Sequence, residues 1–293
     1  MALVSEPATS TGTARLVAVT AVVMVAFASN SLLNRSALAD ELIGPGEFAA
    51  IRVVSGAAVL VLLVGIADRS APRPGKPDPA AIAGLAAYLI GFSFAYVSID
   101  AGIGALILFG GVQATMFAGA LAGGERPPAN RWLGMAIAVV GLVVLFWPSD
   151  SVELPARGAL LMLIAAVGWG VYSLIGRRVT EPLRATAWNF VYAAPLVVAA
   201  WLAFADGDET TTRGVVLAVV SGAVTSGLGY ALWYSILPQL GATNAALAQL
   251  SAPVIAIALG AMLLDESITV QAVIAAVLVL GGIAVGTRTR TAS

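Results

Sequence analysis

Ten apolar runs of about 20 residues follow one another along the chain, separated by short segments that hold most of the charge and proline. A helix needs about 20 mostly apolar residues to cross the hydrocarbon layer of a bilayer. The runs lie at residues 15–34, 47–66, 80–99, 102–122, 131–147, 157–176, 185–204, 213–235, 242–263 and 269–287. The sequence therefore predicts an all-α integral membrane protein with ten transmembrane helices and no soluble domain.

Composition supports this interpretation and narrows the chemistry. Only 11% of the residues are charged, whereas a soluble domain carries about a quarter. The chain contains no cysteine and no histidine, so disulfides, thiolate nucleophiles, imidazole bases and the commonest zinc ligands are excluded. A net charge of -1 offers no basic surface for nucleic acid. We therefore expect no catalytic residue, metal or cofactor, and the expected partners are the lipid bilayer and a small molecule. The oligomeric state is left open.

The distribution of lysine and arginine predicts the orientation, because basic residues gather on the cytoplasmic side. One side holds Arg15, Arg69, Arg73, Lys76, Arg126, Arg131, Arg177, Arg178, Arg184, Arg288 and Arg290, and the other Arg35, Arg157 and Arg213. We therefore expect a protein of the inner membrane with both termini in the cytoplasm. The termini would form polar tails at 1–14 and 288–293. The first run also resembles a cleavable secretion signal, but its apolar residues continue through Leu32 and Leu33 beyond the supposed cleavage site, which argues against cleavage.

Two segments recur at nearly equal offsets, which predicts an internal repeat. SLLNR, which ends at Arg35, returns as SLIGR, which ends at Arg177, 142 residues later. AGIGAL at 101–106 matches ATNAAL at 242–247, 141 residues later, and the same offset relates Glu125 to Glu266 and Gly141 to Gly282. We expect two five-helix repeats, at 15–147 and 157–287, joined by an external linker at 148–156.

Five is an odd number, so the second repeat must enter the membrane from the opposite side and the two repeats must be inverted. Inverted repeats are typical of secondary transporters, which hold their substrate near the membrane midplane between the halves and open to either side in turn. The predicted architecture is therefore a pair of inverted five-helix repeats around a central cavity.

Two longer motifs add a family resemblance. AAIRVVSGAAVLVLL surrounds Arg52, and GATNAALAQLSAPVIAIALGAMLLDE runs from Gly241 to Glu266. With ten helices, the chain resembles the EamA-type members of the drug/metabolite transporter superfamily, and among them the YddG-like exporters of aromatic amino acids. The resemblance implies a basket of helices whose first, third, fourth, sixth, eighth and ninth members line the cavity. It also implies the outward direction of transport. The first half departs from the motif, with Val112 where the second half has Pro253.

Polar and aromatic side chains at mid-depth should face a cavity or another helix. The candidate substrate-binding residues are Asn30, Tyr88, Tyr96, Gln113, Trp169, Tyr172, Tyr230, Trp233, Asn244 and Gln249. The aromatic rings would supply apolar surface, and each carboxamide has four hydrogen-bonding positions to satisfy. Two alternatives stay open. Trp233 is explained equally well as an anchor at the membrane interface, and the carboxamides are explained equally well as links between helices.

Charge is expected only near the ends of the runs, where Glu47, Arg52 and Asp100 lie. Ion-driven pumps and carriers of charged cargo usually need an ionisable group within the membrane, so the sequence favours cargo that is neutral or zwitterionic. Backbone amides at helix starts would then meet the carboxylate of an amino acid. Glycine pairs, Gly119 with Gly123 and Gly282 with Gly286, predict close helix packing.

The function predicted from these features is export of small neutral metabolites, with aromatic or other hydrophobic amino acids as the favoured cargo, by alternating access. Other neutral metabolites or drugs are the alternative within this class. A channel or a lipid-handling subunit is an alternative from another class, and a channel would conduct without saturating. An intramembrane enzyme would need paired carboxylates, histidine or cysteine in the bundle interior, which the sequence does not offer.

Overall fold

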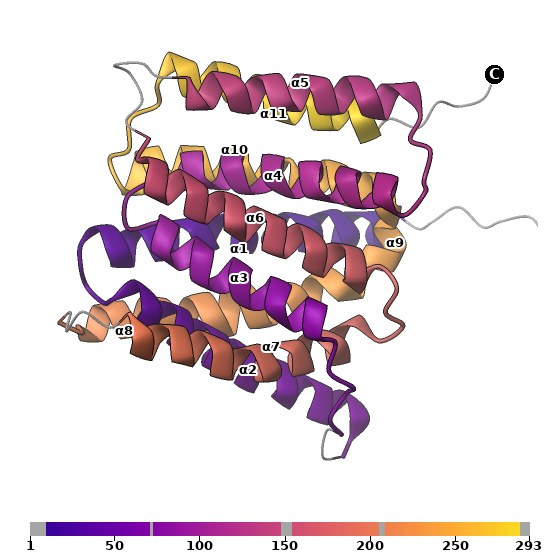
Figure 1. Ribbon diagram of the computed structural model, residues 1–293. Coiled ribbons are helices and arrows are strands. Elements are labelled where there is room, and N and C mark those ends of the chain that lie inside the picture. The colour runs from indigo at the N-terminus through magenta and orange to yellow at the C-terminus, as the bar shows by residue number, and fades with distance from the viewer. Residues whose placement is uncertain (1–9, 71–72, 148–153, 205–208, 288–293) are drawn as a thin grey trace, which may run out of the picture.

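The computed structural model describes residues 10–70, 73–147, 154–204 and 209–287, and within these ranges the regular elements are helices (Figure 1). They are α1 Ser10–Ala39, α2 Pro45–Asp68, α3 Pro79–Ala95, α4 Ala101–Ala122, α5 Ala129–Phe146, α6 Ala156–Gly176, α7 Pro182–Ala203, α8 Thr212–Val219, η1 Val220–Leu228, α9 Gly229–Gln249, α10 Ser251–Leu263 and α11 Val270–Thr287. Most of the predicted linker and tails, at 1–9, 148–153 and 288–293, lies outside the described residues.

Helix starts follow local chemistry. Proline occupies the first turn of α2, α3 and α7, where its missing N–H would have no helical partner. Asp78 caps α3, because its Oδ1 accepts hydrogen bonds from the backbone N–H groups of Ala80 and Ala81 at 3.0 Å each. Thr211 caps α8 in the same way through the N–H of Gly214, at 3.0 Å. Such caps satisfy donors that the helix itself cannot.

Eight helical runs are long and apolar enough to cross a membrane, and α8, η1 and α9 together supply one of them, Thr212–Leu240. The helices α3 and α10 are also apolar but shorter, at 17 and 13 residues. The chain is thus a multi-pass membrane protein.

The predicted boundary between the eighth and ninth helices is wrong. A break was expected at 236–241, yet α9 continues through this stretch to Gln249, and the break comes at Leu250. Pro253 explains the position, because a proline ring clashes with the carbonyl four residues before it and disfavours an unbroken helix there. Pro253 instead lies in the first turn of α10, where proline is tolerated. The nine residues of η1 form a π-helix in the middle of this run.

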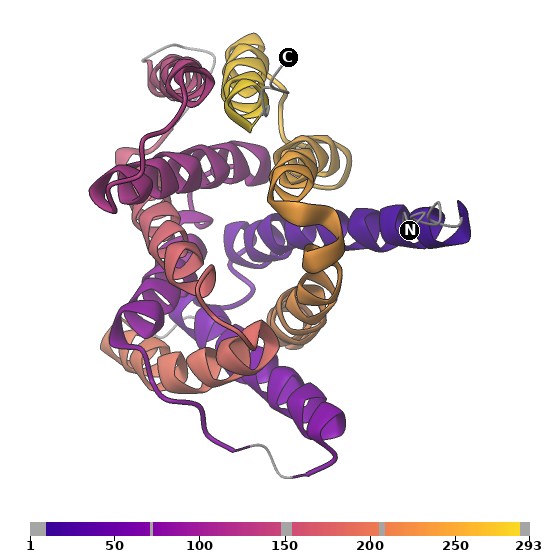
Figure 2. The same cartoon turned by 90° about the vertical axis from the view of Figure 1, so that its right-hand side faces the viewer.

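The helices pack in pairs (Figures 1 and 2). The pair α5 and α11 lies at one end of the bundle, α2 packs along α7, and α3 packs along α6. The helix α4 contacts α6 and α10, while α1 contacts α4, α9, α10 and η1. Helices distant in sequence therefore meet around α1 and α4.

Glycine allows the closest of these crossings. A Cβ atom added at Gly282 of α11 would lie 2.6 Å from the backbone nitrogen of Ala138 in α5, so only glycine fits there. Gly119 packs against the side chain of Leu174, whereas Gly123 meets only the backbone of its own helix and forms the C-cap of α4. The predicted role in close packing is confirmed for Gly282 and Gly119 and wrong for Gly123.

Candidate substrate cavity

A cavity of about 50 Å³ lies where α1, α3, α4, α6 and α9 meet. Its lining consists of Phe27, Asn30, Ser31, Tyr88, Phe92, Leu108, Phe109, Val112, Trp169, Tyr230, Trp233 and Gln249. Six of the predicted binding residues are thereby brought together: Asn30, Tyr88, Trp169, Tyr230, Trp233 and Gln249. Four of these six are aromatic and the other two, Asn30 and Gln249, are carboxamides, so the cavity is an aromatic box with two carboxamides in its wall.

The rings of this box pack on one another. Trp169 stacks on Tyr230 with ring centroids 5.4 Å apart and an interplanar angle of 22°, and it lies 4.8 Å from the ring of Tyr88. Phe27 packs edge-on against Tyr230 at 5.6 Å and Trp233 at 5.9 Å. Pockets that bind small molecules measure about 300–1,000 Å³. The rings therefore fill most of the space that a ligand would need, and this conformation has room for only a few waters.

The polar residues of the cavity wall also join helices. Asn30 is buried, and its Oδ1 accepts hydrogen bonds from Ser221 at 2.9 Å and Thr225 at 2.5 Å, which connects α1 to η1. One turn later, Asn34 Oδ1 accepts from the hydroxyl of Ser93 on α3, at 2.9 Å. Asn30 thus lines the cavity and fixes the π-helix to α1 at the same time.

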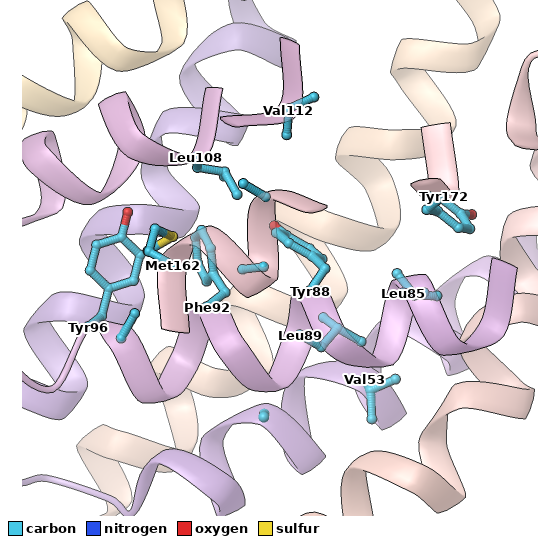
Figure 3. Close-up of a cluster of buried hydrophobic side chains, with 14 of the residues drawn as sticks. Val53, Leu85, Tyr88, Leu89, Phe92, Tyr96, Leu108, Val112, Met162 and Tyr172 are labelled. Carbon is cyan, nitrogen blue, oxygen red and sulfur yellow. The ribbon is translucent and has the colours of Figure 1, made fainter. Parts of the chain in front are cut away.

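The other predicted residues lie elsewhere. Tyr96 is fully buried one turn beyond Phe92 on the same face of α3, and its hydroxyl donates to the carbonyl of Ala101 at 3.3 Å (Figure 3). Tyr172 lies apart from the Tyr88–Phe92–Tyr96 row in Figure 3 and donates to Thr186 at 3.1 Å. Both are absent from the cavity lining, as is the half-buried Gln113. Asn244 belongs to α9, but its side chain lies outside the described part of the structure.

Several lining residues were missed. Phe27 lies three positions before Asn30 and Phe92 lies four positions after Tyr88, so helical spacing places the members of each pair on one face. Leu108, Phe109 and Val112 have no such signal, because an apolar residue in an apolar helix can face lipid or the interior equally well.

The position of the Arg52 side chain differs from the prediction. Its position near the end of an apolar run led us to expect it at the membrane boundary and to expect a charge-free interior. Instead the side chain is fully buried between α2, α3 and η1. Its Nε donates to Ser226 Oγ at 3.2 Å, and its Nη2 donates to the hydroxyl of Tyr88, a cavity residue, at 2.9 Å. A positive charge therefore lies directly behind the cavity wall.

Ion pairs connect helices at both ends of α4. Where α4 begins, Arg35 of α1 lies 3.5 Å from Asp100 and 3.6 Å from Glu266, which follows α10. The Glu266 side chain is only 9% exposed and accepts a hydrogen bond from the N–H of Ala101 at 2.7 Å. Burial raises the pKa of Glu266 and Asp100 adds to this effect, against the opposing influence of Ala101 and Arg35.

Where α4 ends, Glu125 lies 4.0 Å from Arg131 and 3.9 Å from Arg177. These side chains are about half exposed, so the pairs are screened by solvent. The two ends of α4 thus carry the same kind of ion pair. The Glu266 carboxylate is largely shielded and hydrogen-bonded to Ala101, whereas the Glu125 carboxylate is half exposed.

Comparisons with known proteins show the family of the chain. The model of the EamA-like transporter family matches residues 156–287. An uncharacterized protein of Pseudomonas aeruginosa is 43% identical over 270 residues, which are 92% of this chain and 93% of the relative. The chain belongs to the EamA-like transporter family.

Other members are more distant. A protein of Escherichia coli named probable amino-acid metabolite efflux pump is 27% identical over 66% of this chain and 70% of its own. An uncharacterized transporter of Bacillus subtilis is 26% identical over 85% of this chain and 86% of its own. A crystal structure matches with a TM-score of 0.63 and 20% identity, over 93% of this chain and 97% of that one, which shows the fold alone. This EamA-like protein is therefore a membrane transporter, and its relatives' names point away from an enzyme.

Proposed function

We propose that this EamA-like transporter exports small amino-acid metabolites with aromatic or other hydrophobic side chains, by alternating access through the central cavity. The cavity lining carries the proposal, because rings from α3, α6 and α9 meet there beside the carboxamides of Asn30 and Gln249. Aromatic rings attract aromatic and aliphatic side chains, and a carboxamide can both donate and accept hydrogen bonds. The relatives of Escherichia coli and Salmonella typhimurium that are named probable amino-acid metabolite efflux pumps support an amino-acid metabolite as cargo and the outward direction.

The small size of the cavity supports a cycle with more than one conformation. Substrate can enter only if the rings separate, for example Trp169 from Tyr88, whose centroids are 4.8 Å apart. In the proposed repeat these two residues belong to different halves. A rocking movement of one half against the other would open the box toward one side of the membrane at a time.

The ion pairs at the two ends of α4 support the proposed inverted repeat. With an offset of 141 or 142 residues, Arg35 corresponds to Arg177 and Glu125 to Glu266. Arg35 pairs with Glu266 at one end, and Glu125 pairs with Arg177 at the other. Each arginine thus pairs with the glutamate of the other half, as a twofold axis in the membrane plane would require.

The proposed topology has ten crossings, with α3 and α10 as short spans, and both termini in the cytoplasm of an inner membrane. The chain has no native cysteine, so single cysteines can report sidedness without background. Ser70→Cys should react with a membrane-impermeant maleimide only from the cytoplasmic side, and Glu209→Cys only from outside. Both positions are exposed. Labelling of both from one side would contradict this topology.

Reconstituted liposomes test the function. Vesicles loaded with labelled phenylalanine should release it faster than protein-free vesicles, and the rate should saturate with internal concentration. A rate that rises without saturation would favour a channel. If phenylalanine stays at the level of protein-free vesicles while another solute moves, the proposed cargo is wrong.

A further inference from the structure

The guanidinium of Arg52 has hydrogen-bonding capacity that the protein does not use. Its hydrogen bonds go to two hydroxyl groups, those of Ser226 and Tyr88, and Nη1 has no partner within the part of the chain that the structure describes. The same described residues supply no carboxylate that pairs with it. A guanidinium keeps its charge in a protein interior, so the site holds a buried cation without a counter-ion.

The surroundings stabilise this cation only in part. The guanidinium carbon lies 5.2 Å from the ring centroid of Tyr88 and 4.9 Å from that of Phe92, distances at which cation–π attraction operates. Rings and hydroxyls carry no negative charge, however, and a buried ion usually needs a paired charge to offset its loss of hydration. An anion that reached Nη1 would therefore be bound strongly.

The route to this anion site leads through the cavity. Tyr88 and Phe92, the two rings that face Arg52, both line the cavity. One layer of aromatic side chains separates the guanidinium from the space where substrate is proposed to bind. A rotation of the Tyr88 ring would break its hydrogen bond to Nη2 and leave Nη2, like Nη1, without a hydrogen-bond partner.

We propose that Arg52 recognises a carboxylate on the transported molecule, so that the substrates are hydrophobic carboxylates, amino acids among them. The inference rests on the proposed role of the cavity as the transport site. A carboxylate matches the planar fork of a guanidinium, and its single charge neutralises one arginine. The aromatic rings then hold the apolar body of the same molecule. Arg52 replaces the helix-start amides, which the sequence had favoured for this role.

A series of phenylalanine analogues tests the proposal on the unmodified protein. Phenylalanine and 3-phenylpropionate keep the carboxylate, whereas phenylalaninamide and phenethylamine lack it. The first two should raise the melting temperature of the purified transporter and compete with labelled phenylalanine in liposomes. The two amines should do neither at ten times the concentration. Equal competition by phenylalanine and phenylalaninamide would overturn the assignment of Arg52 while leaving phenylalanine transport established.

Substitutions at Arg52 test whether this residue causes the preference for a carboxylate. Arg52→Gln should weaken phenylalanine binding by about 10- to 100-fold, as expected for a lost charge-assisted hydrogen bond, and should remove the preference for the acid over the amide. Arg52→Lys should restore part of that preference. Arg213→Gln, which removes an exposed arginine in the first turn of α8, is the matched control and should bind as the parent does. If Arg52→Gln binds phenylalanine normally, Arg52 has no role in recognition.

The same assays separate this inference from the proposed cargo. If phenylalanine fails but 3-phenylpropionate binds and the amines do not, the amino-acid function is wrong and carboxylate recognition stands. Should Arg52→Gln fail to fold, Arg52→Lys carries the test, because it keeps the positive charge but loses the planar fork. An acid-to-amide preference of Arg52→Lys equal to that of the parent would then overturn the role of Arg52. Binding of the amines and not of the acids would reverse the expected charge preference and overturn the proposal.

Discussion

The replacement Glu266→Ala should lower the free energy of unfolding by about 2–3 kcal/mol. It leaves the N–H of the fully buried Ala101 without its acceptor, and an unsatisfied buried donor costs about 1–3 kcal/mol. The pair with Arg35, at 3.6 Å and with Arg35 21% exposed, adds at most about 1 kcal/mol. A loss of this size corresponds to a melting temperature lower by about 4–8 °C in detergent.

Glu266→Gln is the control that separates the hydrogen bond from the charge. Glutamine retains a side-chain oxygen that can accept from Ala101, so we expect its melting temperature to stay within about 2 °C of the parent. If the glutamine and alanine variants lose equal stability, the charge and not the hydrogen bond holds this end of the bundle, and the reasoning above is refuted.

The pH dependence of Glu266 has a definite sign. Burial raises its pKa above the ordinary value of 4.5, so the folded state binds the proton more tightly than the unfolded chain. Its contribution to stability is fully present below pH 4.5 and is lost as pH rises through the raised pKa. The melting temperature of the parent, relative to Glu266→Gln, should therefore increase as pH falls from 7 to 5. A decrease would mean that attraction to Arg35 outweighs burial.

Three further predictions concern helix packing, ring contacts and an exposed ion pair. Gly282→Ala should destabilise the protein by about 2–3 kcal/mol because its Cβ would meet the α5 backbone, whereas Gly281→Ala, with open space around it, should leave the melting temperature unchanged or higher. Trp169→Ala should raise the KM for phenylalanine export by about 3- to 10-fold through lost ring contacts, and Trp147→Ala, 68% exposed at a helix end, should not change it. Glu125→Gln should alter the free energy of unfolding by less than about 0.5 kcal/mol, because its ion pairs are long and half exposed; a loss as large as that of Glu266→Ala would contradict this.

Hydropathy alone predicts an all-helical membrane protein and eight helical runs long and apolar enough to cross a bilayer, whereas α3 and α10 are shorter than it predicts. The boundary that failed, between the expected eighth and ninth helices, lies in a stretch where Pro238, Gln239 and Gly241 are typical of a loop. Helical backbone passes through it to Gln249, and the break is set by Pro253. The length of an apolar run therefore predicts that a helix exists better than where it ends.

The cavity could be predicted in part for a similar reason. Polar residues such as Asn30 and Gln249 are costly in lipid, so their presence in an apolar run indicates an inward direction. Leu108 and Val112 bear no such cost on either face. For Arg52 the position along the helix can be counted from the sequence, but the direction of its side chain cannot. A charged side chain that faces lipid is costly even some residues from the end of a span. That cost alone predicts that Arg52 faces the interior.

The π-helix η1 has a mechanical consequence. At its start, Gly222 is seated against the backbone of α2 at Arg52, where an added Cβ would lie 2.8 Å from the Arg52 Cα atom. At its far end the chain leads directly into Tyr230 and Trp233 of α9. A π-helix is wound more loosely than an α-helix. If η1 tightened to α-helical winding while its start stayed in place, the rings of Tyr230 and Trp233 would both rotate about the helix axis and change position in the cavity wall.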